Sequence, residues 1–519
     1  MQQPSGGDAA TTRLDARLVP AALTSWAVTA VGVLWPVGSV VGSVCAAGSV
    51  FGLLLWRAGH RSPRLRAIGV GLVVVGVVGA GFGFAIALRA NAVARHPVTA
   101  AFGTAAQVVV TPSESALSLG RGRLMFRAKL QQLGHDQISG RVVVFAPARD
   151  FSAVMVGQPM RFRARITRPT RHDLTVAVVN AVGEPAIGRA GPVHRAAHAV
   201  RAGFAARARQ VLPADQAAML PALVLGDMST VSTVTSQEFR AAGLTHLTAV
   251  SGANVTIVCG AVLFTSRLIG PRAAVALAGV ALVVFVIVVQ PTASVLRAAV
   301  MGAIALVGVL SSRRRQAIPA LAATVLLLMV TAPQLAVDVG LALSVVATAA
   351  LVVIAPIWSR RLVAAGWPKP FSDAVCVACA AQLVTAPLIA GISGRVSLVA
   401  AAANLAVAAL IAPITVLGSA AGALCPFWPA GAQLLIRFTG PELWWVLRIA
   451  HWAAGVPAAN VPVPSGLPGV LLVGAAGVLA AVLWRRRWFR AGMAVVAAGL
   501  LAWSLSGLLV GAGGSVGNT

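Results

Sequence analysis

Long runs of uncharged, mostly apolar residues recur along the chain, and short arginine-rich segments separate them. A membrane-spanning helix needs about 20 consecutive apolar residues. The uncharged run 21–56 is too long for one span, so we expect a tight pair of helices that breaks near Pro36. The run 67–88 has the length of one further span. The chain is therefore predicted to begin with a polar tail over 1–20 and membrane helices over 21–88.

A second membrane block is expected over residues 216–519, where uncharged runs alternate with polar breaks. The run 396–436 is long enough to cross a membrane twice. The two blocks together predict about 12 or 13 spans. The uncharged runs of the second block are 241–266, 273–296, 298–312, 316–337, 339–359, 374–394, 396–436, 449–484 and 491–519.

The composition agrees with a membrane protein and excludes the other large classes. The 519 residues are 58% hydrophobic and only 10% charged, and the mean hydropathy is +0.86. Soluble globular proteins carry about 25% charged residues. The excess of apolar residues also excludes disordered, collagen-like and coiled-coil chains. The expected fold class is a polytopic α-helical membrane protein.

The distribution of arginine predicts the topology. The segment 57–66 carries four arginines, and basic loops remain in the cytoplasm. If 21–56 is a hairpin, the N-terminus is also cytoplasmic and residues 89–215 lie outside the inner membrane. Later loops agree, since 290–294 and 333–336, expected outside, carry no basic residue. The loops expected inside, all with basic residues, are 267–272, 311–315, 359–369 and 485–490.

Residues 89–193 are polar enough for a small water-soluble domain. Short strand-like runs separated by turn residues predict about five strands in a β-barrel of the oligonucleotide-binding (OB) type. A basic amphipathic helix, of the kind that lies on membrane surfaces, is expected over 194–215. The expected strands are 107–110, 121–130, 141–145, 160–166 and 175–182.

Two of these strands alternate apolar and basic residues, which gives each an apolar face and a basic face. A basic face suits nucleic-acid phosphates, although ordinary solvent-exposed arginines give the same pattern. The chain has no tyrosine, and Phe126 and Phe162 fall on the apolar faces. Binding would therefore depend on phosphate contacts and on salt. The candidate DNA-binding residues are Arg121, Arg123, Arg127, Lys129, Arg161, Arg163 and Arg165.

Polar residues interrupt the apolar segment 241–266 near its start. Polar groups inside a membrane are costly and tend to face a bundle interior or a watery path. We therefore take His246, Ser251, Gly252 and Asn254 as candidates for a polar path. The alternative is a helix start in which the Thr, Ser and Asn side chains bond to their own backbone.

Arg297 stands alone between the uncharged runs 273–296 and 298–312. An arginine in the middle of a span costs about 3 kcal/mol or more unless it is paired or hydrated. It either lines a polar path or reaches the outer boundary by snorkelling. Asp338 is the sole acidic residue between Glu238 and Asp373, and it is the candidate ion-pair partner of Arg297.

The order of four motifs resembles that of the ComEC-type competence proteins. The segments are GLTHLTAVSGANVTIV at 243–258, PTASVLRAAVM at 291–301, PQLAVDVGLALSVVATAAL at 333–351, and 381–414. The resemblance implies a channel over 216–519 that passes one DNA strand into the cytoplasm during natural transformation. It also implies an external OB-like domain before the channel. Ser344, Gln382 and Asn404 lie inside these segments and complete the candidate path.

The sequence departs from this family at two places. Many members carry a histidine where Asn254 stands, and asparagine cannot titrate near neutral pH. Larger members end in a metallo-β-lactamase-like domain whose two metals need a histidine-rich cluster. Here the only near pair among the eight histidines is His194 and His198. We therefore expect a short form without that domain, with no enzymatic activity, cofactor or metal.

The leading hypothesis is thus a non-enzymatic channel whose partners are single-stranded DNA and the lipid bilayer. Candidate protein partners are a DNA receptor, a separate nuclease and cytoplasmic proteins that handle single strands. The alternative is a secondary transporter or lipid-handling protein of the same architecture. The polar breaks at 246–254 and 290–297 favour that alternative, because they resemble the discontinuous helices of transporters. The lack of an inverted repeat in the spacing of the runs argues against it.

Overall fold

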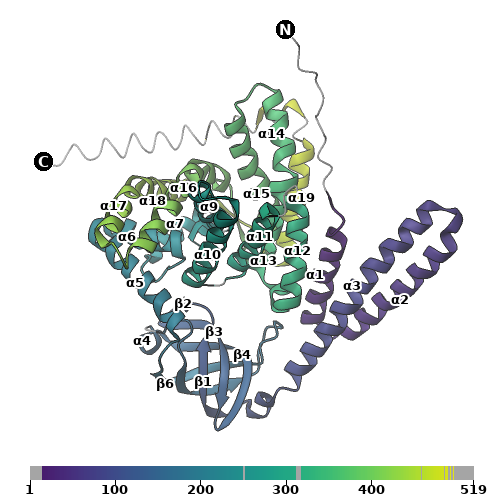
Figure 1. Cartoon of the computed structure of the whole chain (residues 1–519), viewed down its shortest axis with the longest axis horizontal. Coiled ribbons are helices and arrows are strands. Elements are labelled where there is room, and N and C mark those ends of the chain that lie inside the picture. The colour runs from purple at the N-terminus through teal and green to yellow at the C-terminus, as the bar shows by residue number, and fades with distance from the viewer. Residues whose placement is uncertain are drawn as a thin grey trace. The chain divides into compact units, whose positions relative to one another are not determined.

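The computed structural model describes residues 15–499 apart from residues 153, 249, 251, 291, 311–316, 457, 458, 484, 485, 489, 490, 493, 494 and 496–498. The chain divides into two compact units. Unit 1 is bounded by Met1–Ala199 and Cys259–Ala342, and unit 2 by Val200–Val258 and Leu343–Thr519. Helices dominate both units, and unit 1 also contains a barrel of strands (Figure 1).

Unit 1 begins with helices whose backbones approach each other closely. They are α1 (Val19–Leu34), α2 (Gly38–Ala58), the 3₁₀ turn η1 (Gly59–Arg61) and α3 (Pro63–Ala94). The predicted break near Pro36 is confirmed, because α1 ends before it and α2 begins after it. A Cβ on Gly69 would lie 2.7 Å from the carbonyl oxygen of Gly52, and one on Gly76 would lie 2.6 Å from that of Cys45. Small residues therefore allow the α2–α3 contact, as is common between helices in lipid.

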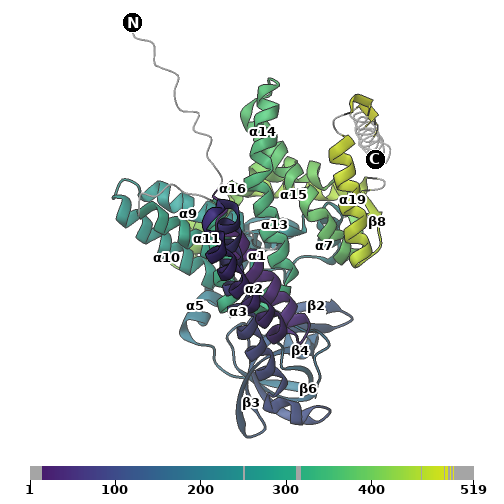
Figure 2. The same cartoon turned by 90° about the vertical axis from the view of Figure 1, so that its right-hand side faces the viewer.

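Five strands of unit 1 close into a barrel (Figure 1 and Figure 2). The order is β1-β5-β6-β4-β3, and β3 pairs again with β1. The β4–β6 pair is parallel. This is a five-stranded Greek-key barrel of the OB type. The strands are β1 (Ala105–Pro112), β2 (Leu117–Gly120, which extends the edge of β3), β3 (Arg123–Leu133), β4 (Asp136–Pro147), β5 (Met160–Thr167) and β6 (Ala177–Ile187).

Apolar side chains fill the barrel. Burial alternates residue by residue along β5, as the sequence predicts for a strand with one face on the core. The short helix α4 (Ala148–Phe151) places Phe151 against Phe126 and Phe162, with ring centroids 6.5 and 5.2 Å apart. Phe126 and Phe162 therefore serve the core, and the predicted assignment of these rings to the apolar faces is confirmed.

The remaining elements of unit 1 lie before and after the barrel in the sequence. They are η2 (Pro97–Ala101), which precedes β1, and α10 (Pro271–Val289), α11 (Ala293–Leu310), α12 (Ala317–Thr331) and η3 (Pro333–Val337), which follow the barrel. Trp26 on α1 donates its indole N–H to the carbonyl oxygen of Ala336 at 2.8 Å. Arg89 on α3 donates to the carbonyl oxygen of Val330 at 3.0 Å. These bonds join the N-terminal helices to α12 and η3.

Unit 2 consists of helices and one small antiparallel sheet of two strands. Its elements are α6 (Ala214–Leu225), α7 (Thr233–Ala241), α8 (Thr245–Thr248), α14 (Ala355–Ala364), α15 (Lys369–Ser393), β7 (Arg395–Ser397), α16 (Ala400–Leu424), α17 (Pro429–Phe438), α18 (Gly440–Gly455), β8 (Asn460–Pro462) and α19 (Leu467–Leu483). Three helices have residues in both units. They are α5 (Pro192–Val211), α9 (Gly252–Ser266) and α13 (Val339–Val353).

The predicted basic helix corresponds to α5, and its second half is packed into unit 2. Phe204 and Ala208 are completely buried. A Cβ on Gly422 of α16 would lie 4.0 Å from the ring of Phe204. Gln210 accepts a hydrogen bond from Gln433 of α17 at 2.9 Å.

Six of the described helical segments are long and apolar enough to cross a membrane. They are Gly38–Ala58, Pro63–Ala101, Pro271–Val289, Val339–Ala364, Lys369–Ser393 and Ala400–Leu424. Shorter apolar helices, among them α1, α6, α9, α11, α12 and α19, accompany them. The run 396–436, expected to cross twice, instead holds one long helix, α16, followed by the ten-residue α17. The chain is a multi-pass helical membrane protein with an inserted barrel, which confirms the predicted fold class.

Candidate functional site

The outer face of the barrel carries the predicted basic residues. Arg161, Arg163 and Arg165 on β5 are exposed, because the residues between them point into the core. On β3, Arg123 and Lys129 are exposed and Arg127 is half-buried. Arg121 lies in the turn between β2 and β3, where its φ of 51° is left-handed. The predicted alternation of basic and apolar faces on both strands is confirmed.

Strand β1 lies between the two basic rows. Gln107 pairs with Arg163 on one side of β1, and Thr111 pairs with Lys129 on the other. Neighbouring strands are about 4.8 Å apart, so about 10 Å separates β3 from β5. The arginines of β5 and Lys129 of β3 therefore share one face of the barrel, across the outward side chains of β1.

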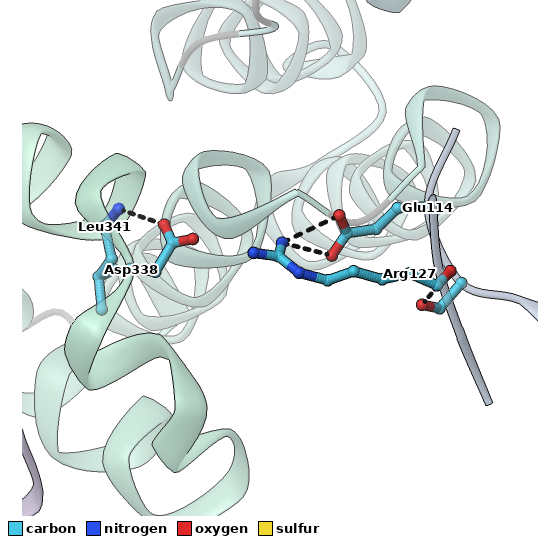
Figure 3. Close-up of polar contacts among 5 residues, drawn as sticks. Glu114, Arg127, Asp338 and Leu341 are labelled. Atoms are coloured by element: carbon cyan, nitrogen blue, oxygen red, sulfur yellow. Dashed lines mark hydrogen bonds and ion pairs between the residues drawn. The ribbon is translucent and has the colours of Figure 1, made fainter. Parts of the chain in front are cut away.

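Arg127 differs from the other basic residues because carboxylates surround it (Figure 3). Its Nη1 donates to both carboxylate oxygens of Glu114, at 3.1 and 3.2 Å. The carboxylate of Asp338 points toward the same guanidinium (Figure 3). Burial disfavours the charged form, but attraction by Glu114, Asp338 and Asp173 outweighs it and raises the pKa of Arg127.

Arg141 on β4 lies beside this cluster and pairs in register with Lys129. Its Nη1 is buried, and the described residues offer it no hydrogen-bond partner. Burial, and then the like charge of Arg127, lower the pKa of Arg141. Glu114, Asp173 and Asp338 oppose that shift. The part of the barrel that carries Arg127 is therefore a mixed-charge cluster, whereas the three arginines of β5 form an exposed basic row.

In unit 2, Asn254 is 3% exposed and belongs to a cluster at the end of α6. It donates Nδ2–H to the carbonyl oxygen of Leu223 at 3.0 Å. Arg201 donates to the carbonyl oxygen of Leu225 at 2.8 Å and lies 3.8 Å from the carboxylate of Asp227. The last carbonyls of a helix lack partners within it, and positive charge is favourable there. Asn254 and Arg201 therefore stabilise the C-terminus of α6.

A second polar network in unit 2 centres on the carbonyl oxygen of Ala241, the last residue of α7. It accepts hydrogen bonds from Oγ of Ser397 on β7, at 2.9 Å, and from Nδ2 of Asn460 on β8, at 3.3 Å. Gln382 on α15 donates to the carbonyl oxygen of Ser397 at 3.3 Å. Ser397 therefore connects the predicted path residue Gln382 to the last residue of α7.

The motif after α7 turns sharply against α16. Gly243 has φ +71°, and a Cβ there would lie 2.4 Å from Cβ of Ala400. His246 on α8 is exposed, and its Nδ1 is 3.2 Å from the carbonyl oxygen of Gly243. Gly252 begins α9, while Ser251 lies outside the described residues.

The remaining path candidates are placed separately. Arg297 on α11 is 6% exposed, and its Nη1 donates to the sulfur of Met301 at 3.1 Å. The expected pairing of Arg297 with Asp338 is not among the ion pairs of the described residues, since Asp338 faces Arg127 and accepts from the N–H of Leu341. Ser344 on α13 accepts a bond from Thr348 through its carbonyl, and Asn404 is half-buried on α16.

Within the part of the chain that the structure describes, no group of three or more His, Cys, Asp or Glu side chains is placed to hold a metal ion. The predicted near pair, His194 and His198, lies on α5. His198 is 2.9 Å from the carbonyl oxygen of Val156, and a Cβ on Gly157 would collide with the ring of His194. Both histidines therefore pack against the loop that precedes β5.

The family model described as Competence protein matches residues 223–488, more than half of the chain. The chain belongs to the competence protein family. Neither a curated protein nor a solved structure matches it. The suspected resemblance is confirmed, and membership of the family indicates a role in DNA uptake during transformation.

The match to the competence family includes the end of α6 and all of the predicted path residues, whereas the barrel precedes it. Several residues of the networks were not predicted, namely Glu114, Arg201, Asp227, Ser397 and Asn460. Arg201 is one of many arginines in α5, and Ser397 lies 156 residues from its partner Ala241. Asp227 carried the one usable signal, because it is an isolated acid directly after an apolar helix.

Proposed function

We propose that this member of the competence family is the inner-membrane channel that passes single-stranded DNA into the cytoplasm during natural transformation. The observation that carries the proposal is the exposed basic row of the barrel, Arg161, Arg163 and Arg165, in a chain of this family. The row would receive DNA by its phosphates, since the aromatic rings of Phe126 and Phe162 are occupied in the core.

The arrangement of unit 1 supports an extracytoplasmic barrel. The α2–α3 connection and the helix ends beside it carry Arg57, Arg61, Arg64 and Arg66, and the far end of α3 leads into the barrel. Helix α10 has Arg272 in its first turn, while Gln290 at its other end contacts Ser115 of the barrel. Basic segments remain in the cytoplasm. The barrel and the arginines thus lie at opposite ends of two membrane-spanning helices, which favours a cytoplasmic N-terminus and an external barrel.

The path through the membrane is proposed to pass the polar residues of the helices. Asn254 and Gln382 are engaged with backbone carbonyls, so we assign them to the framework that shapes the path. The full set of candidate path residues remains His246, Ser251, Gly252, Asn254, Arg297, Asp338, Ser344, Gln382 and Asn404. Single-stranded DNA, the bilayer and the separate DNA-handling proteins named above are the proposed partners, and no step in this chain requires a cofactor.

The experiment is a salt titration of DNA binding by the full-length protein in lipid nanodiscs, with fluorescently labelled single-stranded DNA. The logarithm of the affinity should fall linearly with the logarithm of the salt concentration, with a slope of about −0.7 for each phosphate neutralised. Arg163→Gln should reduce that slope by about 0.7, since one contact is lost. Arg149→Gln is the matched control, because it removes one exposed arginine elsewhere on the barrel.

Two results would contradict the proposal. The first is the absence of measurable binding at low salt, which would remove the barrel from DNA handling. The second is a deletion strain that takes up DNA at the frequency of its parent, which would remove the whole chain from transformation.

A further inference from the structure

The loop between β1 and β2 meets two helix ends inside unit 1. Ser115 in this loop donates its hydroxyl to Oε1 of Gln290 at 2.5 Å, and Gln290 directly follows the last residue of α10. Glu114, its neighbour, holds Arg127, and Asp338 faces Arg127 from the segment that precedes α13 (Figure 3). Two adjacent loop residues are therefore connected to helix ends, one by a direct hydrogen bond and one through an arginine.

The positive charge of Arg127 is already balanced by nearby carboxylates. One guanidinium faces two carboxylates, Glu114 at 3.1 Å and Asp338 farther away. The side chains of Arg127 and Glu114 are 32% and 35% exposed, so water only partly screens the attraction. A phosphate that approached Arg127 would meet the carboxylates of Glu114 and Asp338 beside it, with Asp173 and the second cation Arg141 in the same cluster. A phosphate that approached Arg163 would meet the exposed row of β5.

Arg127 lies on the part of the barrel where an oligonucleotide would be expected to bind. In OB folds the face of the second and third barrel strands commonly binds the oligonucleotide. Those strands correspond here to β3 and β4, and Arg127 is on β3. The carboxylates of Glu114 and Asp338 thus occupy part of the face that such barrels usually offer to their ligand.

We propose that Arg127 is a positioning residue that, with Glu114 and Asp338, docks the barrel on the ends of α10 and α13 and takes no part in phosphate binding. This goes beyond DNA uptake, because it assigns an interface within the chain that exists with or without DNA. It also divides the basic residues of the barrel into a docking arginine and a ligand-binding row.

The docking is tested by crosslinking the full-length protein in membranes. The five native cysteines are replaced by alanine, and Ser115→Cys and Gln290→Cys are joined with a short bifunctional maleimide. Asp338→Asn should slow crosslinking by about two- to fivefold, the range for a partly exposed charge interaction. Asparagine still caps a helix, so the bond to Leu341 is kept and only the charge is lost. Asp338→Glu should restore the parental rate.

Matched controls separate docking from general damage. Asp136→Asn removes an exposed carboxylate at the start of β4 and should leave the crosslinking rate unchanged. Arg127→Gln should slow crosslinking as Asp338→Asn does. An unchanged rate in Asp338→Asn would overturn the proposal, and so would equal losses in Asp338→Asn and Asp136→Asn.

The DNA-binding measurement distinguishes this inference from the proposed function. Arg127→Gln should keep the salt slope of the parent, while Arg163→Gln should reduce it by about 0.7 and leave crosslinking unchanged. A reduced slope in Arg127→Gln would overturn its assignment as a positioning residue. If no variant and no parent binds DNA, the proposed function fails, and the crosslinking result still decides the docking.

Discussion

The side chain of Asn254 forms a hydrogen bond with the backbone. Its amide donates to the carbonyl of Leu223 near the end of α6. A histidine at this position could form the same bond and also titrate, whereas asparagine can only form the bond. In this chain the amide of Asn254 therefore joins the start of α9 to α6.

Removing that donor should destabilise unit 2. Asn254→Leu leaves the carbonyl of Leu223 without its side-chain donor, and we expect a loss of about 1 kcal/mol in the free energy of unfolding. Unfolding of the detergent-solubilised protein, followed by tryptophan fluorescence, measures it. Thr256→Val is the control, because the hydroxyl of Thr256 donates to the carbonyl oxygen of Gly252 within its own helix. Equal losses in the two variants would show that the bond between α9 and α6 contributes no more to the free energy of unfolding than a bond within one helix.

At the residue scale the sequence shows which charged residues need a partner, but it does not show which residue the partner is. Arg297 and Asp338 are isolated charges in apolar surroundings, and their pairing was the simplest solution. The fold instead brings Asp338 to Arg127, which is 211 positions away on a strand whose register no local pattern specifies. Alternation, by contrast, is a local property, so the outward arginines of β5 were predictable from six residues of sequence.

At the scale of elements, α6 and α16 cross at a contact that admits no added side chain. Gly418 is buried, and a Cβ there would lie 2.4 Å from Cγ2 of Val224. We expect Gly418→Ala to cost about 1–3 kcal/mol of stability through overpacking. Val224→Ala removes the two methyl groups, so Gly418→Ala combined with Val224→Ala should recover much of the loss. A double variant no more stable than Gly418→Ala alone would contradict the direct contact.

Element boundaries were predictable where the chain has strong periodicity or a clear break. The five barrel strands follow from alternation and turn residues, and the α1–α2 break follows from Pro36. Strand β2 was missed because it has four exposed residues and pairs only with the edge of β3. The helices α17 and α18 were missed because Arg437, Glu442 and Arg448 interrupt the apolar pattern, so the uncharged runs stop at 436 and resume at 449.

At the scale of the whole molecule, the topology rests on charge, and the structure adds a geometric argument. The arginines of the α2–α3 connection and of the start of α10 lie at the ends of these helices that are remote from the barrel. Each arginine that crossed the membrane would oppose the bias that retains basic loops in the cytoplasm. Both helices therefore support the same orientation, although they belong to different membrane blocks of the sequence.

Cysteine accessibility in intact cells tests this orientation. In a background without the five native cysteines, Ser118→Cys places a thiol on the exposed strand β2, and His60→Cys places one in the exposed turn η1. A membrane-impermeant maleimide should label the Ser118→Cys variant in intact spheroplasts. It should label the His60→Cys variant only after the membrane is permeabilised. The reverse pattern would place the barrel in the cytoplasm, where Arg161, Arg163 and Arg165 could meet DNA only after it had crossed. The basic row would then act on the exit side, and its assignment as the receiving surface would be wrong.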